Sequence, residues 1–277
     1  MAETTELIIE AGRVESQYWR DLWRYRELFV FFAWRDMLVR YKQTVVGVSW
    51  SLIRPLLTMA VLTVVFGKLG KMPAFGIPYP LLVFCGMLPW QFFSNALTES
   101  GNSLIMNSNM ISKIYFPRLV MTVSSVIASL VDFLISSIFL VVLMLWYHFV
   151  PPLAVVFLPF FVILAFAASL GVGIWVAALM VKYRDFRFIV PFIVQFGLYV
   201  SPVGFQSSIV PARFRLLYAM NPMVGIIDGF RWSLVGVGAN RAIYWPGIVI
   251  AVIEVAFLLV SGIWYFRKTE RTFADVI

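Results

Sequence analysis

The segment Tyr183–Phe205 reads YRDFRFIVPFIVQFGLYVSPVGF and decides the fold class of this chain. Three charges lie within four residues, and eighteen residues without a charge follow, from Phe188 onward. An apolar run of this length is close to what a helix needs to cross the hydrocarbon core of a membrane. A proline inside such a helix, here Pro191, is tolerated where neighbouring groups satisfy the freed carbonyls. The segment therefore predicts a membrane helix packed inside a bundle, with a break near Ser201-Pro202.

The composition of the whole chain agrees with a membrane protein. Hydrophobic residues make up 61% and charged residues 13% of the 277 residues, and the mean hydropathy is +0.89. Soluble domains carry about 25% charged residues, so we expect one polytopic membrane domain. The single cysteine, Cys85, excludes an internal disulfide and a cysteine-based metal cluster.

Apolar runs of about 20 residues predict an all-α polytopic membrane protein with six transmembrane helices. The predicted spans are Ser51–Gly67, Tyr79–Leu97, Leu119–Trp146, Leu153–Val181, Phe188–Phe205 and Trp245–Phe266. A seventh apolar stretch, Phe214–Val237, contains polar and helix-breaking residues: Asn221, Pro222, Asp228 and Arg231. It is expected to form a pair of short re-entrant or interfacial helices.

Sixteen of the 22 lysines and arginines fall on one side of these spans. Because positive residues accumulate in cytoplasmic loops, both termini are predicted to lie in the cytoplasm. The same bias accounts for the net charge of +8, so no nucleic-acid partner is expected. The predicted parts are a cytoplasmic N-terminal segment, residues 1–48, a six-span membrane domain, residues 49–266, and a cytoplasmic tail, residues 267–277.

The segment Gln17–Gln43 before the first span has its own helical pattern. A stripe at helical spacing is formed by Tyr18, Leu22, Tyr25 and Phe29. Basic residues lie on another side of the helix, and three tryptophans suit the level of the lipid headgroups. This pattern is typical of a helix that lies in the membrane interface. It serves either as a topological anchor or as a collar that receives an anionic lipid-linked substrate or braces a partner subunit.

The motifs of common catalytic sites are absent from the sequence. It contains no H-E-x-x-H, C-x-x-C or G-x-S-x-G pattern, and Gly67-Lys68 and Gly70-Lys71 lack the other residues of a phosphate-binding loop. The only histidine, His148, is expected at a span end rather than in a metal site. We therefore expect no enzyme activity, no metal and no cofactor bound by this chain.

Four ionisable residues fall within the predicted spans: Arg54, Glu99, Asp132 and Glu254. Charges inside a membrane are by default candidates for function. Asp132 and Glu254 lie well inside their spans, and no basic partner is expected at comparable depth. Polar contacts between helices are favoured here over a proton pathway.

Aromatic residues are abundant, with 26 Phe, 11 Tyr and 10 Trp. Interfacial belts and core packing account for most of them. Aromatic rings also provide a surface along which sugars can slide, because a pyranose ring has an apolar face. The residues predicted to line such a channel are Phe66, Trp90, Phe93, Gln195, Tyr199 and Phe205.

The stretch Gly101–Pro117, GNSLIMNSNMISKIYFP, is predicted to be a mildly amphipathic cytoplasmic loop. Its apolar residues are suited to a groove on a soluble partner. The alternative is an ordinary connecting helix on the membrane surface.

Several motifs in one order carry a family resemblance. They are RYKQTVVGVSWSLIRP at 40–55, GMLPW at 86–90, YFPR at 115–118, Tyr183-Arg184-Asp185 with Ser201-Pro202, and Asn221-Pro222 with Gly229-Phe230-Arg231. From about Tyr18 to Phe266 the chain resembles type-2 ABC-transporter permeases that export O-antigen, capsule and teichoic-acid polysaccharides. The family-motif residues singled out are Arg184, Asp185, Ser201, Pro202, Asn221, Pro222 and Arg231.

The resemblance implies a homodimer of six-span permeases that pairs with two copies of a separate ABC ATPase, which binds ATP and Mg²⁺. It places the coupling element in 101–117, with Asn102, Leu104, Ile105, Asn107, Ile111, Lys113 and Tyr115 as its residues. It places a gate of short helices within 206–240 and a path between protomers lined by the first and fifth spans.

The implied substrate is a lipid-linked polysaccharide that leaves the cytoplasm across the inner membrane. Its pyrophosphate is expected to meet four arginines: Arg20, Arg24, Arg40 and Arg54. Anchoring by positive residues explains the same four positions. The alternatives are a type-2 permease for a drug or another lipid, a secondary transporter, for which internal inverted repeats are required, and a membrane scaffold without transport.

Overall fold

A computed structural model describes residues 15–42, 49–111, 113–114, 116–236, 243–270 and 273. Regular structure in these ranges is helical throughout, which confirms the all-α prediction. Tyr115, one of the predicted coupling residues, lies outside the described residues.

Five helices among the described residues are long and apolar enough to cross a membrane. They are α3 (Ser49–Leu62) with its π-helical continuation η1 (Thr63–Leu69), α4 (Tyr79–Met106), α6 (Leu119–Trp146), η2 (Leu153–Phe157) with α7 (Leu158–Lys182), and α11 (Trp245–Glu270). The predicted fifth span is represented by α8 (Phe186–Val200), which is apolar but has only 15 residues. It is shorter than predicted because the backbone leaves the helical conformation at Ser201, which is extended (φ −81°, ψ 152°).

Helix α4 is the central element of the bundle and contacts α3, α6, α7, α8 and α10. In the most apolar 18-residue stretch of α4, 83% of the residues are buried, whereas in that of the first span 11% are buried. A helix that is apolar on all sides is expected in the interior, and the run Leu81–Leu88 is buried throughout. The first span and α8 pack on α4 from outside and leave wide apolar faces uncovered.

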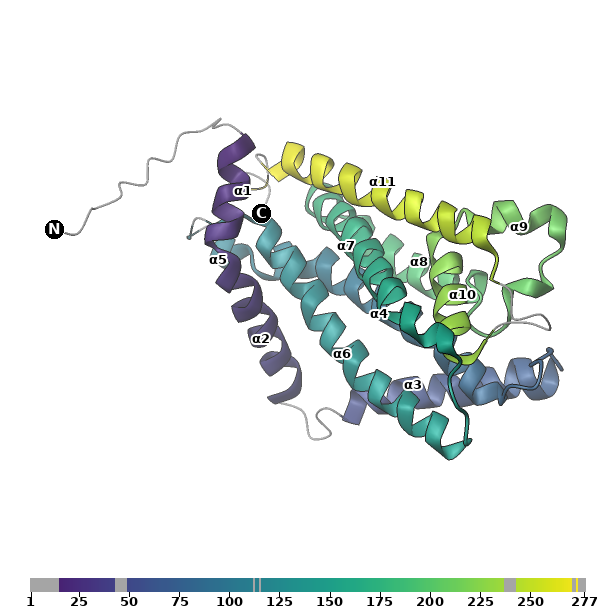
Figure 1. Cartoon of the computed structure of the whole chain (residues 1–277). Coiled ribbons are helices and arrows are strands. Elements are labelled where there is room, and N and C mark those ends of the chain that lie inside the picture. Colours follow the sequence, from purple (N-terminus) through teal and green to yellow (C-terminus); the bar gives the residue numbers. More distant parts are fainter. Residues whose placement is uncertain are drawn as a thin grey trace.

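The N-terminal amphipathic segment forms two helices, α1 (Glu15–Arg24) and α2 (Arg26–Lys42), and α2 lies across α6 (Figure 1). The predicted stripe faces inward, since Tyr18, Leu22 and Phe29 pack against a buried cluster that includes Phe266. The tryptophans on the other side are exposed. The single helix that the pattern predicts is interrupted at Tyr25, and its position in the membrane interface stays a prediction.

The predicted cytoplasmic loop 101–117 begins as part of α4, which continues to Met106 and is followed by the short α5 (Ser108–Ile111). Its polar side chains satisfy carbonyls of their own helix: the amide of Asn102 donates to Thr98 O (2.9 Å) and that of Asn107 to Ser103 O (2.7 Å). Asn and Ser are read as loop formers because they compete with backbone bonds. Here they back-bond to preceding carbonyls, and the helix persists.

Two short helices follow α8, as the interrupted stretch predicts: α9 (Ala212–Ala219) and α10 (Pro222–Val235), preceded by the one-turn η3 (Ser207–Ile209). Asn221 caps α10 by accepting a hydrogen bond from Met223 N (3.1 Å), and Pro222 occupies the first turn, where its missing N–H costs nothing. Helix α9 lies at the end of the molecule opposite α1, α5 and the last turn of α11 (Figure 1).

Candidate functional site

A cavity of about 450 Å³ opens between α2, α3, α4 and α6. Its wall combines charged, amide and hydroxyl groups with aromatic rings. The lining residues are Arg40, Tyr41, Arg54, Pro55, Leu88, Gln91, Phe92, Asn95, Glu99, Ser129, Asp132, Phe133 and Ser136. A mixed wall of this kind suits a ligand that carries both polar and apolar groups.

An ion-pair cluster forms one side of the cavity. Arg40 donates to Asp132 and, at 3.1 Å, pairs with Glu99, while the Tyr41 hydroxyl donates to the second oxygen of Asp132. Burial disfavours the charged guanidinium, but the attraction of Glu99 and Asp132 outweighs it and raises the pKa of Arg40.

The prediction that Asp132 lacks a basic partner is therefore wrong. The partner comes from the interfacial helix α2, which lies across α6 and brings Arg40 to a residue 92 positions further along the chain. For Glu254, Oε2 has no hydrogen-bond partner among the described residues. The predicted polar contact therefore exists at Asp132, between α2 and α6.

Two of the four predicted phosphate-binding arginines lie together. Arg40 and Arg54 line the same cavity, whereas Arg20 and Arg24 are exposed on α1 and are not part of it. Glu99 and Asp132 also line the cavity, and both form ion pairs with Arg40. Arg54 lies near the start of the first span, where it is exposed and lines the same cavity.

A second feature is the break after α8, which is held by Arg231 of α10. The Arg231 side chain is 1% exposed, and its guanidinium donates to Leu82 O (3.0 Å) and Phe205 O (2.6 Å). It also donates to the carbonyls of Pro202 and Val203. One cation therefore binds three carbonyls of the segment that follows α8 and one carbonyl of α4.

The sequence analysis singled out Arg231 as a family-motif residue but did not predict this role. In the structure two of the motifs meet, because a Cβ at Gly86 would lie 2.3 Å from Nη2 of Arg231. The glycine of GMLPW thus leaves room for the arginine of Gly229-Phe230-Arg231. A further link joins Asn221 to Ser201, whose hydroxyl accepts from the Asn221 amide at 3.1 Å.

The predicted channel residues separate into two groups. Gln195 and Tyr199 are exposed on α8, and Phe66 and Phe205 contact each other half-buried, with ring centroids 6.3 Å apart. Trp90 and Phe93 are buried inside the protomer. These two rings line no open surface; Trp90 packs under α8, where a Cβ at Gly197 would lie 2.5 Å from its ring.

The predicted coupling residues also differ in exposure. Leu104 and Ile111 are buried in a cluster with Phe116, so they do not form a docking surface. The exposed apolar side chains at this end are instead Met106 (78%) and Ile114 (60%). Lys113 is exposed, Ile105 is partly buried, and Asn102 and Asn107 bond to their own helix. The motif residues Arg184 and Asp185 are exposed in the turn before α8.

Asp228 of α10 is a buried carboxyl with an expected effect on stability. Burial raises its pKa from 3.8 to about 6, against the hydrogen bond from Ser207 and the charge of Arg231, which lower it. Because the folded protein binds this proton more tightly than the unfolded chain, the contribution of Asp228 to stability is greatest below pH 3.8 and is lost as the pH rises to about 6. We expect a loss of up to about 3 kcal/mol over this interval.

Thermal unfolding of the detergent-solubilised protein between pH 4 and 7 measures this effect. The melting temperature of the native protein is expected to fall more steeply with pH than that of Asp228→Asn, which has no proton to lose there. Equal slopes for the two proteins would contradict the assignment.

Comparison with known proteins gives a consistent result over most of the chain. A family model described as ABC-2 type transporter matches residues 27–235. An O-antigen export system permease protein RfbA of Klebsiella pneumoniae is 28% identical over 257 residues, covering 91% of this chain and 95% of that protein. A protein of the same name from Myxococcus xanthus is 27% identical over 215 residues, covering 76% and 82%. The resemblance inferred from the motifs is confirmed, and the chain belongs to the ABC-2 type transporter family.

Proposed function

We propose that this chain is the membrane permease subunit of an ATP-driven exporter of lipid-linked polysaccharide of the O-antigen type. The observation that carries the proposal is the similarity to O-antigen export system permeases along nearly the full length of both chains. The helical, multi-pass architecture and the mixed polar and aromatic cavity support it.

The functional unit in this proposal is a homodimer in the inner membrane with both termini in the cytoplasm. Its support is the uncovered apolar surface of the first span and α8, including Leu57 (62% exposed), Phe188 (81%) and Tyr199 (60%). Two such faces, opposed across a dimer axis, enclose a path lined by exposed aromatic side chains. The segregation of α1, α5 and the last turn of α11 at one end supports the common side of the termini (Figure 1).

The energy in this proposal comes from two copies of a separate ABC ATPase that binds ATP and Mg²⁺. The sequence has no phosphate-binding loop of its own. The surface offered to the ATPase is the end of α4 with α5, where Met106, Lys113 and Ile114 are exposed. Closure of the ATPases pushes on this surface and opens the path between protomers, with α9 and α10 at its far end.

The substrate enters at the cavity beside the first span. Arg54 meets the pyrophosphate, while the paired Arg40 holds α2 against α6 and keeps the cavity wall in place. Sugar residues then advance along the exposed rings of α8, of which Phe192 and Phe196 stack with centroids 6.0 Å apart.

Vesicles that contain the chain and its ATPase test the proposal directly. ATP-dependent translocation of lipid-linked polysaccharide is expected, with none when ATP is withheld. Transport of another lipid or a drug but not of the polymer would favour the alternative substrate class. Transport driven by an ion gradient without ATP would favour a secondary transporter.

Arg54→Gln is expected to lower export about tenfold, measured per amount of folded protein. Loss of one charge-assisted contact to phosphate removes about 1.4 kcal/mol of binding. Export rate against substrate concentration measures the effect. Arg20→Gln is the matched control, because Arg20 is exposed on α1 and lies outside the cavity. An equal loss of export in both variants would show that the cavity does not recognise the pyrophosphate of the substrate.

A further inference from the structure

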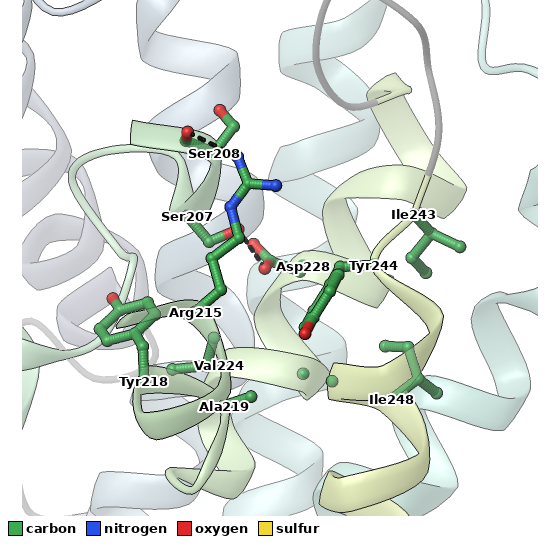
Figure 2. A pocket seen from close by; sticks show the side chains of 12 residues that line it. Ser207, Ser208, Arg215, Tyr218, Ala219, Val224, Asp228, Ile243, Tyr244 and Ile248 are labelled. Carbon is green, nitrogen blue, oxygen red and sulfur yellow. Dashed lines mark hydrogen bonds between the residues drawn. The ribbon is translucent and has the colours of Figure 1, made fainter. Parts of the chain in front are cut away.

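A second, smaller cavity lies between η3, α9, α10 and the start of α11 (Figure 2), at the end of the molecule where Figure 1 shows α9. Its volume is about 100 Å³, and it is open on one side. The side chains that the inference uses are Ser207, Ser208, Arg215, Tyr218, Asp228 and Tyr244. All six lie in the segment between α8 and α11, and Tyr244 is the last residue before α11.

The polar focus of this cavity is the carboxylate of Asp228, whose side chain is only 8% exposed. Ser207 donates to Oδ2, as the dashed line in Figure 2 shows. Within the part of the chain that the structure describes, Oδ1 has no hydrogen-bond partner. A buried acceptor without a donor costs free energy, so this oxygen is suited to a donor that arrives from outside the chain.

The neighbouring cations do not fill this role, because their donors are directed elsewhere. Arg215 donates to Val210 O and Ser208 O, both at 3.2 Å. Arg231 donates to the carbonyls at the α8 break. The hydroxyl of Tyr218, which also lines the cavity, is buried without a partner among the described residues.

The rest of the wall is apolar and partly aromatic. Figure 2 shows the Tyr244 ring beside Asp228, with Ile243 and Ile248 next to it. A carboxylate acceptor beside an aromatic ring matches a sugar, whose hydroxyls donate hydrogen bonds and whose C–H face packs on rings. A metal ion fits poorly, since no group of three metal-ligating side chains exists among the described residues.

We propose that this cavity binds the hydroxyl-bearing edge of one neutral sugar residue, with Asp228 as the acceptor and Tyr244 as the apolar wall. The inference deepens the proposed function and rests on it, because it supplies a contact for the polymer at the far end of its path. The volume of about 100 Å³ holds several water-sized groups, since one water needs roughly 10–15 Å³ on the same measure. It therefore encloses a hydroxymethyl arm and an adjacent hydroxyl while the remaining ring lies over the open side. An anionic sugar is disfavoured by repulsion from Asp228.

Saturation-transfer difference NMR on the full-length protein in lipid nanodiscs tests this site. The probes are methyl glycosides of glucose, galactose, mannose and rhamnose. Methyl glucuronide tests whether an anionic sugar binds, and glycerol tests whether any small polyol does. Asp228→Asn removes the charged acceptor with little change of shape. Ser208→Trp fills the mouth from an exposed position, where it does not disturb the core. Arg213→Gln is the control, because Arg213 stacks on Phe214 of the same helix and does not line the cavity.

At least one neutral glycoside is expected to bind, and binding is expected to weaken about tenfold in Asp228→Asn. Ser208→Trp is expected to abolish it, and Arg213→Gln to leave it intact. The site is overturned if no neutral glycoside binds, if both pocket variants bind as the native protein does, or if methyl glucuronide or glycerol binds equally well. ATP-dependent export without sugar binding overturns the pocket alone. Sugar binding without export in vesicles contradicts the proposed function and leaves the pocket in place.

Discussion

Arg231→Met is expected to lower the stability of the folded protein by about 3–5 kcal/mol, or to prevent its accumulation altogether. The variant leaves four backbone carbonyls without their donor: those of Leu82, Pro202, Val203 and Phe205. Buried acceptors that lose a charged donor each incur a desolvation penalty. Fluorescence-detected size exclusion and thermal unfolding in detergent measure the loss.

Two further variants distinguish the loss of hydrogen bonds to the carbonyls after α8 from a general effect of removing charge. Arg231→Lys keeps the charge but offers no planar fork of donors, so an intermediate loss is expected. Gly86→Ala places a methyl group against the guanidinium, where the Cβ distance is 2.3 Å, and is expected to destabilise the same contact. Arg213→Gln on α9 is the control and is expected to be silent. An Arg231→Met protein that melts like the native one would show that the α8 break is held by other contacts.

Arg40→Gln is expected to destabilise the protein by about 1–3 kcal/mol and to reduce export, because it leaves Glu99 and Asp132 without their shared cation. The estimate is below that for a fully buried pair, since the Arg40 and Glu99 side chains are 29% and 43% exposed. Asp132→Asn is expected to cost less, because Arg40 retains Glu99. The double variant Arg40→Gln/Asp132→Asn is expected to be more stable than the sum of the single losses predicts.

This cycle distinguishes positioning from substrate contact. If the double variant regains folding and export together, Arg40 serves to hold α2 against α6. If folding returns while binding of lipid-linked substrate stays lost, Arg40 contacts the pyrophosphate as the sequence-based hypothesis has it. Transport by Asp132→Asn with the same pH dependence as the native protein would contradict a proton pathway through Asp132.

Five of the six predicted spans correspond to described helices long enough to cross a membrane, and the predicted fifth span corresponds to the shorter α8. The third predicted span, Leu119–Trp146, coincides with α6 at both ends, and the sixth begins at Trp245 as α11 does. The break at Ser201-Pro202 and the start of α10 at Asn221-Pro222 were also predicted. These features depend on local properties: the length of an apolar run and the backbone limits of proline.

The end of α4 was less predictable, because asparagine competes with backbone hydrogen bonds and favours loops, whereas Asn102 and Asn107 bond to preceding carbonyls of α4. The exposure of the predicted channel residues could not be obtained from the sequence either. Trp90 and Tyr199 are both aromatic residues of apolar helices, yet one is buried and the other exposed. Exposure depends on which neighbouring helix covers a residue, and no local pattern states this.

The sequence by itself therefore determined that this chain is a helical membrane protein, where several of its helices begin, where α8 breaks, and to which family the chain belongs. Only the tertiary structure decided what its charges do. It assigned Arg40 to Asp132 across 92 positions and Arg231 to the carbonyls after α8. The physical reason is that a charge in an apolar protein must find a partner in three dimensions. That partner is set by the packing of helices, whereas the apolar runs that form the helices are set along the chain.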